Sequence, residues 1–186
     1  MVPFAGYSMP VQYPMGIARE HLHTRDQAGL FDVSHMGQVR LRGNQAAVAL
    51  ERLMPVDIIG LGEMNQRYAL FTNERGGIMD DLMVTNACDH LFVVVNAACK
   101  EQDIAHMRQH IGDDCEIEVL EDHALLALQG PAAAAVMSRF VDGLERMVFM
   151  NAANLSIDGI GCFVTRSGYS GEDGFEISVA NADAER

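Results

Sequence analysis

The 186-residue chain contains no tryptophan, and its 13 Lys and Arg residues are outnumbered by 26 Asp and Glu residues. The resulting net charge of −13 argues against a nucleic-acid-binding surface, which needs clustered cations to displace counterions. It argues equally against adhesion to an anionic membrane. No apolar run approaches the roughly 20 residues that a membrane-spanning helix needs. A small anionic ligand held by a few local cations is compatible with this composition.

Several motifs with a known chemical use are also missing. There is no Walker loop, no G-x-G-x-x-G after a strand, no G-x-S-x-G and no H-E-x-x-H, so nucleotide-binding, hydrolase and zinc-protease interpretations have no support. The four cysteines form no C-x-x-C and no zinc-type cluster, so we expect free thiols in a reducing compartment and no metal site. The first residues lack the charged and apolar regions of a signal peptide, and we expect a soluble, intracellular protein.

The pattern of apolar residues predicts an α+β fold with a mixed, mainly antiparallel sheet and packed helices. Residues 1–15 hold three of the five prolines and are expected to be irregular, and residues 17–28 are expected to form a helix that Gly29 ends. Residues 38–41 alternate as a half-buried strand does. The stripe formed by Ala46, Ala49, Leu50, Leu53 and Met54 predicts a helix capped by Asn44 and ended by Pro55.

The remaining elements follow from the same reasoning. Residues 66–72 and 78–86 are predicted to be strands of a hairpin around the glycine-containing loop 73–77. The unbroken apolar run 91–95 predicts a strand covered on both faces. Asn96 is expected to cap a helix that buries Ile104, Met107 and Ile111. Further strands are predicted at 116–120, 124–128, 160–166 and 174–179, with a helix that starts at Pro131 and carries the stripe Ala133, Val136, Met137, Phe140 and Val141.

Two adjacent carboxylates, Asp80 and Asp81, stand at the start of an apolar, strand-like run directly after a glycine turn. Successive side chains of a strand point to opposite faces, so the two acids cannot share a face. One should face solvent or a turn amide, and the other the apolar side, where a carboxylate needs a partner or a function. A turn-capping Asp with a satisfied neighbour and a functional acid both remain open at this point.

Glycines also shape the segment 167–176, where three glycines in seven residues allow the backbone to approach a ligand closely. A hairpin with solvated acids is the alternative, which Glu176 fits less well than Glu172 or Asp173. Asp32 could orient His35, although a buried histidine bonded to backbone explains that pair as well.

Taken together, these segments resemble the folate-dependent aminomethyltransferases, in particular the T-protein of the glycine cleavage system. The segments that carry the resemblance lie in the family's order along nearly the whole chain: 4–10, 32–37, 76–84, 95–98, 128–131 and 168–176. The resemblance implies a transferase that passes an aminomethyl group from the lipoyl arm of H-protein to tetrahydrofolate, with release of ammonia. It implies a cytoplasmic protein in bacteria and a mitochondrial matrix protein in eukaryotes.

The resemblance also assigns residues. Asp81 matches the family's key aspartate, which orients the accepting nitrogen of folate and stabilises a developing iminium-like cation. Asp80 would then be a structural partner that binds turn amides. The positions that match the folate pocket are Tyr68, Asn96, Tyr169 and Glu176, the last of which holds the amino-pyrimidine edge of the pterin, with Met36 and Met83 as apolar walls.

Some features depart from the family pattern. Thr85 stands where the family often has an aromatic residue, and the family's Gly-x-x-Ala-Arg-Asp-type segment is not found. We therefore expect residues 1–186 to be one folate-binding domain, incomplete at both ends, without the C-terminal barrel domain, so that this fragment alone need not be active. The alternatives are a folate-dependent demethylase of the same superfamily and a non-catalytic folate-binding protein, although the Lys-Gly-Cys-Tyr-type motif of one such group is absent.

Overall fold

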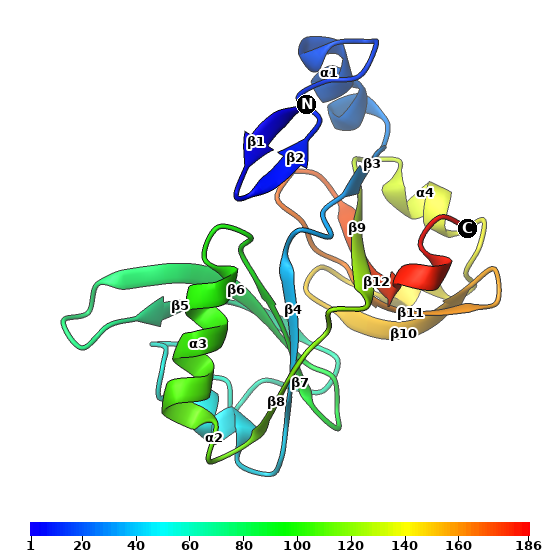
Figure 1. Ribbon diagram of the computed structural model, residues 1–186. Coiled ribbons are helices and arrows are strands. Elements are labelled where there is room, and N and C mark those ends of the chain that lie inside the picture. The colour runs from blue at the N-terminus through cyan, green and yellow to red at the C-terminus, as the bar shows by residue number, and fades with distance from the viewer. The chain divides into compact units, whose positions relative to one another are not determined.

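A computed structural model describes residues 1–186, which separate into two compact units. Unit 1 comprises Met1–His35 and Asp122–Arg186, and unit 2 comprises Met36–Glu121. Unit 2 is therefore inserted in sequence between the two segments of unit 1 (Figure 1). None of the helices combines the length and the apolar character that a bilayer-spanning helix requires.

Unit 2 is built on a five-stranded sheet in the order β5-β6-β7-β4-β8, with every neighbouring pair antiparallel. Its core lies between one face of this sheet and the two helices, α3 lying across the strands in Figure 1. Val39, Leu82 and Val93 of the sheet are buried there with Leu50 of α2 and Met107 of α3. The elements are β4 (Gly37–Arg42), α2 (Ala46–Glu51), β5 (Gln66–Thr72), β6 (Ile78–Asn86), β7 (Leu91–Val95), α3 (Lys100–Ile111) and β8 (Glu116–Val119).

The strand predictions in unit 2 are largely confirmed. The hairpin strands β5 and β6 begin and end where the sequence predicts, and all five residues of β7 are buried. The predicted alternation of β4 is confirmed for Val39 and Leu41, which are buried, and for Arg40, which is partly exposed, whereas Gln38 departs from it at only 2% exposed. β4 lies between β7 and β8, and its polar face is covered only at Gln38, where the strand begins.

The helices of unit 2 bury the predicted stripes but do not have the predicted caps. All five residues of the first stripe are buried, although α2 itself ends at Glu51. The residue before α2 is Gln45 and the residue before α3 is Cys99, and neither helix has a side-chain cap. The predicted capping by Asn44 and Asn96 is therefore wrong, and the amide of Asn96 is engaged elsewhere.

Unit 1 contains a second five-stranded antiparallel sheet, in the order β10-β11-β12-β9-β3, and a separate β1-β2 hairpin. Val164 and Phe175 of this sheet are fully buried in a core that Ala133 and Met137 of α4 share. The elements are β1 (Val2–Phe4), β2 (Tyr7–Met9), α1 (Ile17–Asp26), β3 (Gly29–Asp32), β9 (His123–Gln129), α4 (Ala133–Met137), β10 (Ala152–Ile157), β11 (Ile160–Thr165) and β12 (Gly174–Ala180), with 3-10 turns at Leu144–Arg146 and Asn181–Asp183.

Three predictions in unit 1 are wrong. Residues 1–15 are not wholly irregular, because β1 and β2 pair around a turn in which Ala5 and Gly6 both have positive φ. Gly29 does not end a helix at residue 28; α1 ends at Asp26, and Gly29 begins β3, where it pairs with Gln129. The helix after Pro131 ends at Met137, so Phe140 lies outside it and is 53% exposed.

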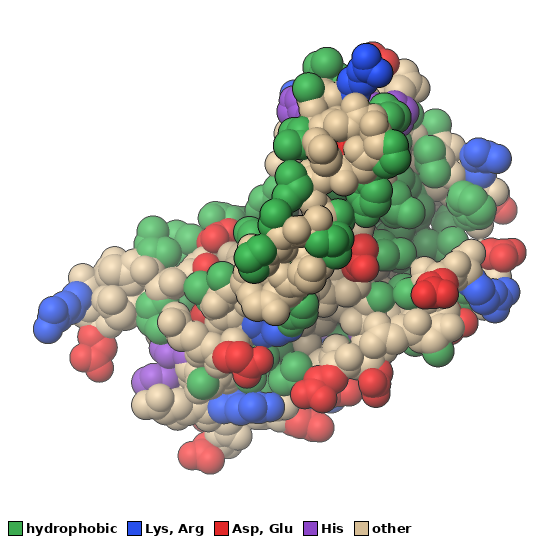
Figure 2. Space-filling view, turned by 45° about the horizontal axis from the view of Figure 1, so that its top comes forward, with side chains coloured by type: hydrophobic (Ala, Val, Ile, Leu, Met, Phe, Trp, Pro, Cys, Tyr) green, Lys and Arg blue, Asp and Glu red, His purple; other side chains and the backbone are tan.

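The predicted α+β class with mainly antiparallel pairing is confirmed, although two five-stranded sheets and a two-stranded one are formed in place of a single sheet. Exposed apolar side chains gather around the β1-β2 hairpin and α1 of unit 1 (Figure 2). They include Phe4, Tyr13, Met15, Ile17 and Leu22, each more than half exposed.

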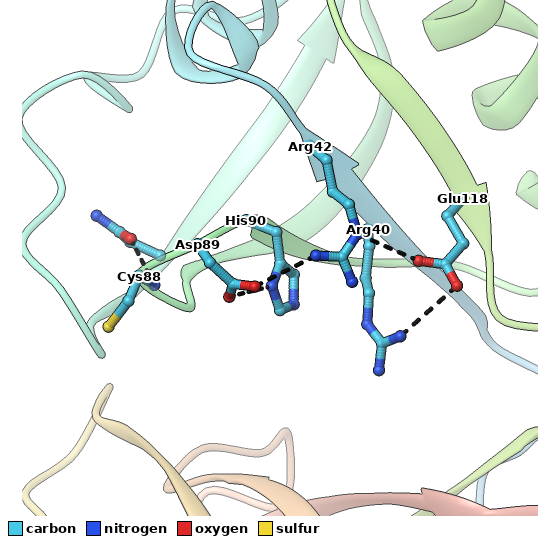
Figure 3. Close-up of polar contacts among 7 residues, drawn as sticks. Arg40, Arg42, Cys88, Asp89, His90 and Glu118 are labelled. Atoms are coloured by element: carbon cyan, nitrogen blue, oxygen red, sulfur yellow. Dashed lines mark hydrogen bonds and ion pairs between the residues drawn. The ribbon is translucent and has the colours of Figure 1, made fainter.

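The edge of the unit 2 sheet carries a chain of ion pairs (Figure 3). Glu118 lies 3.6 Å from a guanidinium nitrogen of both Arg40 and Arg42, and Arg42 lies 3.2 Å from Asp89. The ring nitrogen Nδ1 of His90 lies 2.7 Å from Asp89, and this hydrogen bond, with the charge of His90, lowers the pKa of Asp89. Because these groups are partly or largely exposed, solvent screens each pair, and none of them is a major source of stability.

The helix–sheet core of unit 2 generates a stability prediction. Replacing the fully buried Met107 by alanine leaves a cavity under α3, and we expect the free energy of unfolding to fall by about 2–5 kcal/mol. Arg108→Ala, at the next and exposed position of the helix, should change it by less than about 0.5 kcal/mol. Denaturant unfolding of both variants measures the difference, and equal losses would contradict the placement of α3.

Candidate functional site

The two adjacent aspartates point to opposite faces of the unit 2 sheet, as the sequence predicts. Asp81 pairs with Leu70 and Asp80 with Phe71, and the register shifts directly afterwards, between Phe71 and Thr72. Asp80 shares its face with the buried core residues of β6, and Asp81 shares the other face with Met83. Both carboxylates are half-buried.

Neither aspartate caps the preceding turn. The side-chain oxygen of Asn73 accepts hydrogen bonds from the backbone N–H groups of Arg75, at 3.0 Å, and Gly77, at 2.9 Å. The expectation that Asp80 binds turn amides is therefore wrong, because Asn73 already occupies that role. This arrangement removes the turn-capping explanation for the pair of acids.

Asn96 follows the last residue of β7 and connects the two aspartates. The register places Val95 opposite Leu82, so the Asn96 side chain reaches the start of β6. Its Nδ2 lies 2.9 Å from the backbone carbonyl of Asp81, 3.1 Å from Oδ1 of Asp81 and 3.2 Å from Oδ1 of Asp80. An amide nitrogen carries only two hydrogens, so three acceptors share them.

Tyr68 and Met83 lie next to this cluster. They are opposite each other on β5 and β6, with Met83 buried and Tyr68 46% exposed. The pKa of the Tyr68 hydroxyl is raised by desolvation and by the charge of Asp81, to which the hydroxyl hydrogen-bonds. The structure thus brings together four of the predicted site residues: Tyr68, Asp81, Met83 and Asn96.

Met36 lies at the same end of the sheet. It directly precedes β4, whose first residue, Gly37, pairs with Val95. That register places Met36 beside the end of β7 from which Asn96 projects. Its side chain is half-buried.

The sequence analysis missed Asp103, a fully buried acid on α3. Desolvation, together with the neighbouring Asp80 carboxyl group and the charge of Asp81, raises the pKa of Asp103 to about 8. The residue lies four positions before Met107, on the stripe of α3 that faces the core. The helical period therefore places Asp103 on the buried face of α3, but the prediction took only the apolar residues of this stripe into account.

Glu176 is a predicted site residue whose carboxylate is buried, and it belongs to unit 1. It lies on β12 between Ala127 of β9 and Thr165 of β11, and it is 7% exposed. Ser167 donates a hydrogen bond of 3.0 Å to Oε2 of Glu176, and the hydroxyls of Ser167 and Thr165 lie 2.8 Å apart. Burial raises the pKa of Glu176, while these two hydroxyls partly oppose the shift.

The loop before β12 is held by Gln129, another residue that sequence analysis did not single out. Its amide nitrogen donates to the backbone carbonyl of Ser167 at 2.9 Å, and its oxygen accepts from Ser170 at 2.9 Å. A Cβ at Gly168, where φ is +155°, would lie 2.0 Å from the side-chain oxygen of Gln129, so glycine is required there. Tyr169, between these contacts, is 63% exposed.

The other acids of this loop are ion-paired. Arg166 binds both carboxylate oxygens of Asp173, at 2.9 and 2.6 Å, and Arg25 lies 2.9 Å from Glu172. Glu172 and Asp173 are thus paired with arginines, whereas no arginine pairs with Glu176. This difference agrees with the prediction that Glu176 fits a hairpin with solvated acids less well than Glu172 or Asp173. The loop is tied at both ends and the buried Glu176 follows it.

The His35 side chain is half-buried rather than buried, and the charge of His35 is the smallest of the causes that act on the pKa of Asp32. Oδ1 of Asp32 accepts from the backbone N–H of Ser34 at 3.0 Å, and the hydrogen bonds from Ser34 are the main cause of the lowered pKa of Asp32. The His35 ring packs edge-on against Phe4 and Tyr7, with 5.8 Å between ring centres in each case.

No set of three or more His, Cys, Asp or Glu side chains is arranged to hold a metal ion.

This fold and these residues define a member of a known domain family. The family described as "GCVT N-terminal domain" matches residues 1–186, and the chain belongs to it. Among individual proteins, the chain is 50% identical to the human mitochondrial aminomethyltransferase, covering 99% of this chain and 48% of that protein. It is 46% identical to the mitochondrial aminomethyltransferase of Dictyostelium discoideum, covering 100% of this chain and 49% of that protein.

Comparison with solved structures supports the same family. The chain matches the glycine cleavage system aminomethyltransferase T of Bartonella henselae with a TM-score of 0.90 and 42% identity, over 99% of this chain and 50% of that one. It shares only the fold with a heterotetrameric sarcosine oxidase from Corynebacterium, at a TM-score of 0.61 and 19% identity, over 90% of this chain and 85% of that one. The chain spans about half the length of the curated relatives it matches.

The burial of Glu176 predicts a pH-dependent stability. Because its pKa is raised in the fold above the ordinary 4.5, the folded state binds the proton more tightly than the unfolded state. Its contribution to stability is present below about pH 4.5 and is lost as pH rises through the folded-state pKa. Glu176→Gln cannot ionise, so its stability relative to the native protein should increase over this range, by up to about 1.4 kcal/mol per pH unit.

Denaturant unfolding at a series of pH values measures this effect. The control is Glu145→Gln, which removes an exposed acid of the same unit. Its free energy of unfolding should change with pH as that of the native protein does. A Glu176→Gln curve that is also parallel would contradict a raised pKa.

Proposed function

We propose that the protein containing this chain is the tetrahydrofolate-dependent aminomethyltransferase of the glycine cleavage system. It would transfer the aminomethyl carbon from the lipoyl group of H-protein to tetrahydrofolate and release ammonia. Residues 1–186 would form its folate-binding part, located in the bacterial cytoplasm or, in a eukaryote, the mitochondrial matrix. The identity of 46–50% with proteins named aminomethyltransferase along the whole chain supports this proposal.

The observation that carries the proposal is the hydrogen-bonded cluster around Asp81. Asn96 and Tyr68 both donate to this carboxylate and fix its orientation. Tetrahydrofolate would supply the nitrogen that accepts the carbon. The Asp81 carboxylate accepts a hydrogen bond from that nitrogen and places its negative charge beside the positive charge that develops during transfer, which is the general basis of electrostatic catalysis.

Glu176 is proposed to bind the amino-pyrimidine edge of the pterin. A carboxylate that is almost fully buried, with only hydroxyl donors beside it, is poorly solvated, as its raised pKa indicates. Two parallel N–H donors from a ligand would stabilise its charge. Tyr169, Met36 and Met83 are proposed to contact the folate as aromatic and apolar surfaces.

Asp81→Asn should lower kcat by at least about 100-fold, because the amide keeps the shape but removes the charge. The affinity for tetrahydrofolate should stay largely unchanged. The assay is ammonia release from aminomethylated lipoyl H-protein, which depends on tetrahydrofolate, with Asp113→Asn as a control at an exposed site. Native turnover in Asp81→Asn would refute its catalytic role, and methyl transfer without ammonia release would refute the proposed reaction.

Glu176→Ala should weaken tetrahydrofolate binding by roughly tenfold or more, because charged hydrogen bonds of about 1.5–3 kcal/mol are lost. Calorimetric titration with reduced tetrahydrofolate measures this change. Glu145→Ala removes an exposed acid of the same unit and should bind as the native protein does. Unchanged affinity in Glu176→Ala would remove this residue from the site.

A further inference from the structure

The fully buried Asp103 and the half-buried Asp80 both have carboxyl oxygens whose hydrogen bonding is incomplete. Asp103 is 0% exposed, and neither of its oxygens has a hydrogen-bond donor. Oδ2 of Asp80 is likewise buried without a donor. Asp80 points from β6 toward the core face that α3 covers, so the two carboxyl groups meet at this helix–sheet contact.

The charges that shift the titration of Asp103 include no positive one. The charges that act on it are those of Asp80 and Asp81, both negative. The Cys99 thiol, at the start of α3, hydrogen-bonds Asp80, and burial and the neighbouring acids raise the pKa of this thiol. His106 lies one turn after Asp103 on α3, and burial lowers the pKa of its ring, which favours the neutral form. Lys100 lies on the same helix, and Tyr68 lies on β5 beside Asp81.

Two ionised carboxylates in this position would repel each other and leave three buried oxygens without donors. Unpaired buried charges are strongly unfavourable, and adjacent carboxyl groups usually share a proton instead. A protonated carboxyl group gains an O–H donor, which supplies the missing hydrogen bond. Oδ1 of Asp80 already has a donor, because it accepts an N–H from Asn96. Asp103 has no such donor, so the proton belongs on Asp103.

We propose that Asp103 is held as a neutral carboxylic acid that donates a hydrogen bond to Asp80 and thereby positions Asn96 and Asp81. Asp103 is then a positioning residue, since it acts on Asp81 only through Asp80 and Asn96. The positioning role rests on the proposed function, whereas the placement of the proton does not. The raised pKa of Asp103, at about 8, agrees with a neutral acid at physiological pH.

Infrared spectroscopy of the whole protein tests the placement of the proton. At pH 7 the native protein should show a carboxylic-acid carbonyl band that is absent from Asp103→Asn and retained in Glu101→Gln, which removes an exposed acid from the same turn of α3. Above pH 8 the native band should disappear. A native protein without this band, or a band unchanged in Asp103→Asn, would overturn the proposal.

Steady-state kinetics with H-protein and tetrahydrofolate test the positioning role. Asn keeps a neutral donor toward Asp80, so Asp103→Asn should retain kcat near the native value at pH 7. Its kcat should also persist above pH 8, where the native enzyme loses the Asp103 proton. Asp103→Ala removes the donor and should lower kcat by up to about 100-fold, the effect of a displacement of about 1 Å, with little change in KM.

The outcomes separate the two proposals. Native kcat in a folded Asp103→Ala variant, with Asp103→Asn following the native pH profile, would overturn the positioning role. If the native protein shows no aminomethyl transfer, the proposed function fails, while the infrared band still decides where the proton lies. Unfolding of each variant by denaturant verifies that a loss of kcat does not reflect a loss of the fold.

Discussion

The arrangement of the candidate site in unit 2 depends on one side-chain amide. Asn96 donates to both Asp80 and Asp81, although the strand directs these two carboxylates to opposite faces. It reaches them because β7 ends one residue before Asn96, with Val95 opposite Leu82. A slip of one residue in this register would turn every side chain of β6 to the other face and separate the amide from its acceptors. The register of the sheet and the geometry of the acids are therefore set together.

The two units accommodate buried carboxyl groups in different ways. Glu176 lies on a sheet face where the hydroxyls of Ser167 and Thr165 are its polar neighbours. Asp80 lies under a helix, between the amide of Asn96 and the acid of Asp103. Burial raises the pKa of Glu176, which the two hydroxyls oppose only partly, and Oδ2 of Asp80 is buried without a donor. Such carboxyl groups retain hydrogen-bonding capacity that an N–H donor or a proton can use.

Local patterns in the sequence predicted the strands of unit 2 and the opposed directions of Asp80 and Asp81, because these follow from side-chain period and turn chemistry alone. The same local patterns gave wrong predictions where a polar side chain had two possible partners. Asn96 is a good helix cap by type, yet tertiary acceptors on β6 take its amide. Asp103 and Gln129 were missed for a related reason, since their partners Asp80 and Ser167 are distant in sequence. The short β1-β2 hairpin was hidden by its prolines.

The pleat of β6 gives two neighbouring aspartates separate roles. Asp80 faces the helix, and its contacts with Asn96, Cys99 and Asp103 are internal to the protein. Asp81 faces the other side, next to the half-exposed Tyr68. Because Asn73 holds the preceding turn, neither acid is needed there. Asp80 can therefore anchor the hydrogen bonds under the helix while Asp81, bound to the same amide, turns its carboxyl group to the opposite face, so two successive positions of one strand hold one acid inside the protein and one beside the half-exposed Tyr68.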